Sequence, residues 1–189
     1  TKPVAGDQGH MGKYFNTTGP CMPRLHYMLP PADRLVGASL DRYIGDELYW
    51  VLHAPRQTGK TTFLQYWMRE INSGDQAIAC YVSLERCQDV ADATEAMPLI
   101  VNAIRDYAKS FNVAVPDSPD IAPMSMLSEI LTSWSERVAP KPLIVLFDEV
   151  DLLEGPSMVS FLRQLRGGFA KRGVGKFPVI GNRPVLDEQ

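Results

Sequence analysis

Residues 48–62 read LYWVLHAPRQTGKTT, and this stretch decides the fold. Residues 48–53 form a continuous apolar run, which is typical of a strand buried on both faces of a sheet. Residues 54–61 match the phosphate-binding pattern G-x-x-x-x-G-K-[ST], with Ala54 in place of the first glycine. A helix is predicted over residues 60–72, where apolar residues recur at helical spacing. Strand, loop and helix in this order are the context that the pattern requires, so we expect a phosphate-binding loop.

The predicted phosphate loop directs backbone N–H groups and the positive end of a helix dipole at one position, where an anion binds. Gly59 lets the backbone approach closely, Lys60 brings its charge to the β and γ phosphates from an exposed loop-to-helix junction, and Thr61 offers a hydroxyl to magnesium. Ala54 is compatible with the loop if its φ is negative. The alternative is a Gly-Lys-Thr turn that only starts a helix. The predicted nucleotide-binding residues are Ala54, Pro55, Arg56, Gln57, Thr58, Gly59, Lys60, Thr61 and Thr62.

The rest of the chain alternates short apolar runs with helical patterns. Further strands are predicted over residues 77–84, 143–147 and 177–180, and helices over 91–111, 125–137 and after Pro156. Pro98 is expected to break its helix or restart it. In the helix after Pro156, one buried side is expected from Met158, Leu162, Leu165 and Phe169. This alternation predicts an α/β fold with a mainly parallel central sheet.

The run LIVLF at residues 143–147 ends directly before Asp148 and Glu149. Ligands of an open α/β sheet bind at the carboxyl ends of its strands, so both carboxylates are expected beside the phosphate loop. Asp148 would hold Mg²⁺, and Glu149 would orient and polarise the attacking water, with Lys60 as the other catalytic residue. The predicted cofactors are ATP and Mg²⁺. The alternative is a solvated acidic turn that caps the next helix.

The composition narrows the function classes. The chain has 189 residues and a formal net charge of −3, which indicates no general attraction to nucleic acid or to anionic membranes, although a local basic patch stays possible. Its three cysteines lack metal-ligand spacing and predict reduced thiols in a cytoplasmic protein. No membrane span or signal peptide is recognised. Residues 1–10 are interpreted as a tag or disordered leader, 11–45 as an arm packing near the nucleotide site, and 46–189 as the P-loop ATPase core.

The loop APRQTGKTT and the strand LIVLFDEVD resemble those of prokaryotic AAA+-like ATPases, in particular the group allied to signalling (STAND) and archaeal-type ATPases. The stretch RLHYMLPP at residues 24–31 resembles the segment that precedes the loop in such proteins. The resemblance implies a P-loop NTPase three-layer sandwich of strand order 5-1-4-3-2, with the phosphate-loop strand next to the Asp148 strand. It also implies that the C-terminal part and the lid are incomplete in this chain.

The same resemblance implies further site residues. An adenine site is expected near Tyr27 or its neighbouring prolines, although a tyrosine among prolines can also be simple packing. These ATPases complete their sites with an arginine from a neighbouring subunit, and Arg163 and Arg166 are the candidates, the alternative being a solvated basic face. Asn182 falls at the position of a polar sensor, but residues 179–189 read poorly as a strand. The expected partners are further copies of the chain or a protein bound through the missing C-terminal region.

Three functions remain open from the sequence. The first is an ATPase that hydrolyses ATP with magnesium to drive or switch a conformational or assembly change. The second is a nucleotide-gated signalling or binding module with little turnover. The third is a helicase-like ATPase acting on DNA, since residues 148–151 fit a DExD box, but a second lobe and a Ser-Ala-Thr segment are not found. A kinase or GTPase is disfavoured by the tandem Asp-Glu and the lack of an Asn-Lys-x-Asp motif.

Overall fold

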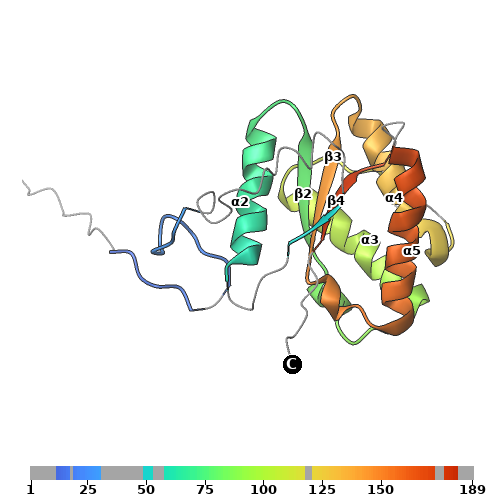
Figure 1. The fold of residues 1–189 in the computed structure, drawn as a ribbon, viewed down its shortest axis with the longest axis horizontal. Coiled ribbons are helices and arrows are strands. Elements are labelled where there is room, and N and C mark those ends of the chain that lie inside the picture. The colour runs from blue at the N-terminus through green and yellow to red at the C-terminus, as the bar shows by residue number, and fades with distance from the viewer. Residues whose placement is uncertain are drawn as a thin grey trace, which may run out of the picture.

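The computed structural model describes residues 12–17, 19–30, 49–52, 58–117, 121–172 and 177–182. Helices and strands alternate along the described chain (Figure 1), which confirms the predicted α/β class. The elements are β1 (Trp50–Val51), α2 (Lys60–Ser73), β2 (Ile78–Ser83), α3 (Ala93–Ser110), α4 (Pro123–Val138), β3 (Leu143–Asp148), α5 (Gly155–Arg172) and β4 (Val179–Asn182). Short 3₁₀ turns follow β2 and β3, over Glu85–Cys87 and Val150–Leu152.

The four described strands form one parallel sheet in the order β1-β4-β3-β2. β4 therefore lies between β1 and β3, and Gly181 of β4 pairs with Trp50 on one side and with Leu146 on the other. The expectation that the phosphate-loop strand adjoins the Asp148 strand is wrong. The expectation that residues 179–189 read poorly as a strand is also wrong for 179–182, because these few residues gain a hydrogen-bonding partner on each side and form an inner strand.

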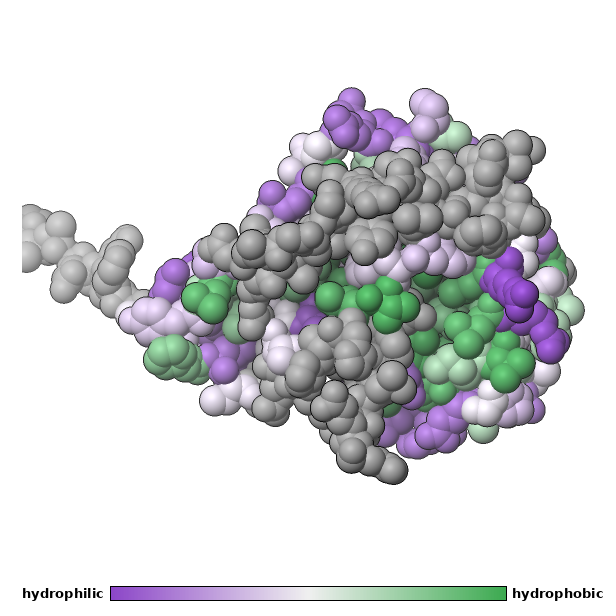
Figure 2. All heavy atoms as spheres, viewed as in Figure 1, coloured by the Kyte–Doolittle hydropathy of each residue, from purple (hydrophilic) through white to green (hydrophobic). Residues whose placement is uncertain are grey.

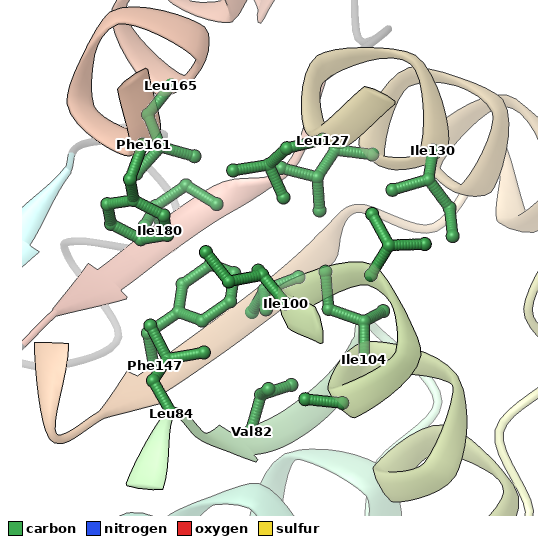
Figure 3. Close-up of a cluster of buried hydrophobic side chains, with 14 of the residues drawn as sticks. Val82, Leu84, Ile100, Ile104, Leu127, Ile130, Phe147, Phe161, Leu165 and Ile180 are labelled. Carbon is green, nitrogen blue, oxygen red and sulfur yellow. The ribbon is translucent and has the colours of Figure 1, made fainter. Parts of the chain in front are cut away.

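Helices cover both faces of the sheet, and each face has its own apolar cluster. α2 covers one face, where Phe63, Leu64, Trp67 and Met68 pack against apolar residues of all four strands. α3, α4 and α5 cover the other face (Figure 1), and their apolar side chains meet those of β2, β3 and β4 in the larger cluster. Figure 3 shows part of the larger cluster, with Phe147 and Ile180 from the sheet facing Phe161 and Ile100 from the helices.

Two local expectations fail at β1 and α3. Val51 is 54% exposed, whereas the apolar run predicted burial on both faces. The reason is the position of β1 at one edge of the described sheet, paired only with β4 among the described strands. Pro98 lies inside α3 and does not break it. Proline removes one helical hydrogen bond, but the residues around it, Met97 and Ile100, are fully buried, and their packing keeps the helix continuous.

The buried side of α5 differs from the predicted one. Phe161 is fully buried, whereas Leu162 is 48% exposed. The helix is turned because Gln164 is buried and bonds to the first turns of α4. Its Oε1 accepts from the backbone N–H groups of Leu127 (2.9 Å) and Ser128 (3.1 Å), while its Nε2 donates to the Pro123 carbonyl (3.2 Å). Leu165 is buried as expected, Met158 is partly buried, and the side chain of Phe169 lies outside the described residues.

Residues 12–17 and 19–30 form an extended segment beside the N-terminal end of α2 (Figure 1). Its two halves meet at a parallel bridge between Tyr14 and His26, and the Cys21 N–H donates to Thr62 Oγ1 at 3.0 Å. Figure 2 shows hydrophobic side chains among hydrophilic ones on this segment. The interpretations of residues 1–10 and of the arm over 31–45 fall outside the described residues. Within the described ranges, no helix combines the length and apolar character that a bilayer crossing takes.

Candidate functional site

The site is built around the N-terminus of α2. Gly59 precedes the helix with φ 78° and ψ 27°, a left-handed conformation that glycine adopts without strain. The first helical hydrogen bond runs from the Phe63 N–H to the Gly59 carbonyl at 2.9 Å. The N–H groups of residues 60–62 lie before this bond in the chain and take no part in the hydrogen bonding within the helix. Such N–H groups, together with the helix dipole, favour an anion. The preceding residues of the predicted loop, Ala54, Pro55, Arg56 and Gln57, lie outside the described residues.

Lys60 is buried, with 5% of its surface exposed. The expected exposed junction is therefore wrong. Lys60 is the first residue of α2, and it is buried together with Phe63, Leu64, Trp67 and Met68 of the same helix. A buried ammonium is stable only when it is paired or hydrogen-bonded, so its charge is held in place rather than free in solvent.

Thr61 and Asp148 are brought into contact by the fold. The Thr61 hydroxyl donates to Asp148 Oδ2 at 2.6 Å, although the two residues are 87 positions apart in the sequence. Asp148 is the last residue of β3 and is fully buried. The parallel sheet explains the meeting, because β3 ends at the edge where α2 begins.

Asp148 is held by two more groups. The Tyr81 hydroxyl donates to Oδ2 at 3.1 Å, and the Glu149 N–H donates to Oδ1 at 3.1 Å. Tyr81 is buried, and its pKa is raised, first by this burial and then by the negative charge of Asp148. The phenol therefore stays protonated and acts as a donor to the carboxylate.

Glu149 follows β3 in a left-handed backbone conformation, with φ 59° and ψ 34°. A non-glycine residue pays on the order of 1 kcal/mol for this conformation, and such strained residues cluster at functional sites. The Ser83 hydroxyl donates to Glu149 Oε2 at 2.9 Å. Ser83 is the last residue of β2 and pairs with Asp148 across the sheet, so the two strand ends place the hydroxyl and the carboxylate side by side.

The residue types at this edge fit a magnesium–phosphate group. Thr61 and Asp148 supply a hydroxyl and a carboxylate oxygen in direct contact, and hard oxygen ligands are those that Mg²⁺ prefers. The first turn of α2 supplies N–H groups and a dipole for phosphate oxygens. Glu149 lies next to both, held at one oxygen by Ser83. The edge thus combines residue types suited to a cation with residue types suited to an anion.

The other predicted site residues lie at the surface. Tyr27 is 55% exposed, and its ring centroid lies 5.2 Å from that of Phe15, a residue that the sequence analysis did not identify. Arg163 and Arg166 are exposed on α5. At about 1.5 Å per residue, they lie roughly 12 and 17 Å along α5 from its start, away from the carboxyl edge of the sheet. Asn182 ends β4, and its side chain lies outside the described residues.

Sequence reasoning missed Tyr81 and Ser83. They alternate along β2, so they share the face of the sheet that carries Asp148. The one signal available was this alternation of polar atoms within an apolar run, and it becomes informative only when the pairing of β2 with β3 is known.

Models of known protein families were compared with the sequence, and none matches. A comparison with curated proteins also finds no match. The residues gathered at the end of β3 and the start of α2 are therefore the features of the chain that indicate a function.

Proposed function

We propose that this chain binds ATP with Mg²⁺ and hydrolyses it. The observation that carries the proposal is the 2.6 Å contact between the Thr61 hydroxyl and Asp148 Oδ2. It joins the Thr of a Gly-Lys-Thr sequence at the start of a helix to the acidic end of a buried parallel strand. These are the two residues that hold the metal in P-loop ATPases.

Each residue of the site has a role in this proposal. Lys60 neutralises charge on the β and γ phosphates, and the first turn of α2 binds the phosphate oxygens. Thr61 and Asp148 hold the magnesium ion, which supplies charge compensation for the phosphates. Glu149 orients the attacking water and accepts its proton. The 2.9 Å bond from Ser83 keeps the Glu149 side chain at this edge.

The sheet supports the proposal of a P-loop NTPase sandwich. The observed order β1-β4-β3-β2 is the order that four strands of a 5-1-4-3-2 sheet would show. Within this proposal, the chain is an AAA+-like ATPase core. The work done with the ATP is a conformational or assembly change in a larger molecule.

Replacement of Glu149 by glutamine tests the hydrolysis. The amide oxygen can still accept the hydrogen bond from Ser83, but the amide cannot accept the proton of water. We expect the affinity for Mg-ATP to stay within about twofold and turnover to fall by about 10² to 10⁴-fold. Glu154→Gln is the matched control, because this exposed carboxylate lies five positions further along and should leave turnover unchanged. Equal turnover in Glu149→Gln and wild type would remove Glu149 from the reaction.

Replacement of Lys60 tests the binding. Lys60→Ala should abolish measurable binding of Mg-ATP in calorimetry. Because Lys60 is buried, its thermal unfolding must be measured alongside, and Lys60→Met is the second variant, since it keeps most of the apolar length of the side chain. Wild-type affinity in either folded variant would contradict the proposal.

A nucleotide-gated switch with little turnover is the second candidate. The bond from Ser83 to Glu149 favours it, because it occupies a carboxylate oxygen that an attacking water would otherwise contact. In that case wild-type protein binds Mg-ATP tightly, releases product slowly or not at all, and Ser83→Ala turns over faster than wild type.

A further inference from the structure

Tyr81 lies outside the two sequence motifs, yet its hydroxyl contacts Asp148, the carboxylate that is the candidate magnesium ligand. Its hydroxyl lies 3.1 Å from Asp148 Oδ2, the same oxygen that Thr61 approaches at 2.6 Å. A carboxylate only accepts hydrogen bonds, so both hydroxyl groups are donors to this one oxygen. The Asp148 carboxylate is therefore held by α2 on one side and by β2 on the other.

The strand pairing fixes where the Tyr81 hydroxyl can reach. Tyr81 is opposite Leu146, and Ser83 is opposite Asp148. Tyr81 thus starts two positions behind Asp148 on the same face of the sheet, and its long side chain spans that offset. A shorter residue at position 81 would not reach the carboxylate, and a residue at position 80 or 82 would face the other side of the sheet.

The Tyr81 ring is itself held by aromatic neighbours from α3. Its centroid lies 5.4 Å from that of Tyr107 at an interplanar angle of 83°, and Tyr107 stacks on Phe111 at 6.4 Å. Tyr81 is 3% exposed. A buried ring in an edge-to-face contact has little freedom to turn, so the hydroxyl position is set by the core.

We propose that Tyr81 is a positioning residue that orients the Asp148 carboxylate toward the magnesium ion. The inference rests on the proposed function, because it assigns Asp148 to that ion. Groups that hydrogen-bond a metal ligand set its orientation, and their loss typically weakens metal affinity by about 10 to 100-fold. The proposal predicts different effects on two measurable quantities, the Mg²⁺ dependence of ATP binding and the affinity for metal-free ATP. Tyr81 affects the magnesium dependence of nucleotide binding and leaves the contact between protein and metal-free nucleotide alone.

The experiment measures ATP binding by calorimetry, once in EDTA and once over a series of Mg²⁺ concentrations. Tyr81→Phe removes the hydroxyl and keeps the ring. We expect its Mg²⁺ midpoint to rise by about tenfold or more, and its ATP affinity in EDTA to stay within about twofold of wild type. Tyr107→Phe is the matched control. Tyr107 makes an edge-to-face ring contact with Tyr81, and this contact does not depend on the Tyr107 hydroxyl. Its Mg²⁺ midpoint should equal that of wild type.

The outcomes distinguish the inference from the function it rests on. If wild type binds ATP in a magnesium-dependent way and Tyr81→Phe has the same midpoint, the role of Tyr81 is wrong and the proposed function stands. If Tyr107→Phe raises the Mg²⁺ midpoint as much as Tyr81→Phe does, the role of Tyr81 is also wrong and the proposed function still stands. If wild type shows no magnesium-dependent binding, both proposals fail.

A second variant covers a loss of folding. Replacement of Tyr81 by p-aminophenylalanine keeps the ring and a hydrogen-bond donor at the position of the hydroxyl, and it should hold the midpoint closer to wild type than Tyr81→Phe does. If neither variant unfolds cooperatively on heating, Tyr81 is a core residue whose hydroxyl contact is incidental, and the inference is overturned.

Discussion

Two adjacent glycines in α5 offer a direct test of how this helix meets the sheet. Gly168 is buried, and a Cβ atom there would lie 2.1–2.3 Å from ring atoms of Phe177. Gly167 is exposed, and a Cβ atom there would have no neighbour within 4 Å. Both lie inside α5, so replacement by alanine gains each variant about 0.5–1 kcal/mol of helix propensity.

The gain in helix propensity is the same in both variants and cancels when their stabilities are compared. The difference that remains is the cost of moving the Phe177 ring away from the new Cβ atom. Phe177 is 3% exposed and packs within the larger cluster, so moving its ring costs about 1–3 kcal/mol. We expect Gly167→Ala to be more stable than Gly168→Ala by that amount in urea unfolding. For a chain of this size the difference corresponds to about 2–12 °C in Tm. Equal stability of the two variants would show that α5 does not press on Phe177, and the placement of α5 would be wrong.

Four further predictions concern other parts of the molecule. Asn72 accepts from and donates to the backbone of Ala79 at 2.8 Å on the open edge of β2, so Asn72→Ala should lower the free energy of unfolding by about 1–3 kcal/mol in urea titration. Burial raises the pKa of Cys80 to about 12 and that of Cys87 to about 11, so at pH 8 mass spectrometry should find neither alkylated in native protein. The folded thiols resist losing protons that unfolded thiols release near pH 9, so the free energy of unfolding should fall as the pH rises from about 9 to 12. If Arg166 completes the site of a neighbour, turnover per subunit should rise with protein concentration, and Arg166→Ala should flatten that rise without weakening ATP binding; constant wild-type turnover would exclude this role.

Much of the sheet and its helices could be predicted from local patterns. The strands at residues 78–83 and 143–148 lie within one or two residues of their apolar runs, because both are buried on two faces. A continuous apolar run is typical of a strand that is covered on both faces of a parallel sheet, which β2 and β3 are and β1 is not. α2 was equally predictable, since its buried residues follow one helical side.

Sheet order and helix rotation could not be predicted in this way. β4 has four residues, and its place between β1 and β3 depends on partners far away in the sequence. The rotation of α5 depends on Gln164, which counts as a polar surface residue in any hydrophobic pattern. It is buried because α4 presents backbone groups that it can bond. Pattern reasoning contains no information about such partners.

The candidate site also has features that the sequence predicts and features that it does not. Thr61 and Asp148 could be placed together from the sequence, because each ends or starts an element at the same sheet edge. The burial of Lys60, and the contacts of Tyr81 and Ser83, required the assembled fold. The strained backbone of Glu149 has no sequence signature at all.

The contacts that both carboxylates make with β2 depend on one strand pairing. Tyr81 and Ser83 lie on β2, and Asp148 and Glu149 lie at the end of β3. A shift of this pairing by one residue would turn both hydroxyl groups to the opposite face of the sheet and remove both bonds together. The interleaved side chains of the two apolar clusters oppose such a shift, because the residues between, Cys80 and Val82, are buried on the α3 side. The geometry of the site is therefore a consequence of the core on both faces of β2. Under the proposed function, a substitution that loosens either cluster should weaken magnesium-dependent ATP binding before it unfolds the chain, since the alignment of two hydroxyl groups fails at smaller displacements than the packing does.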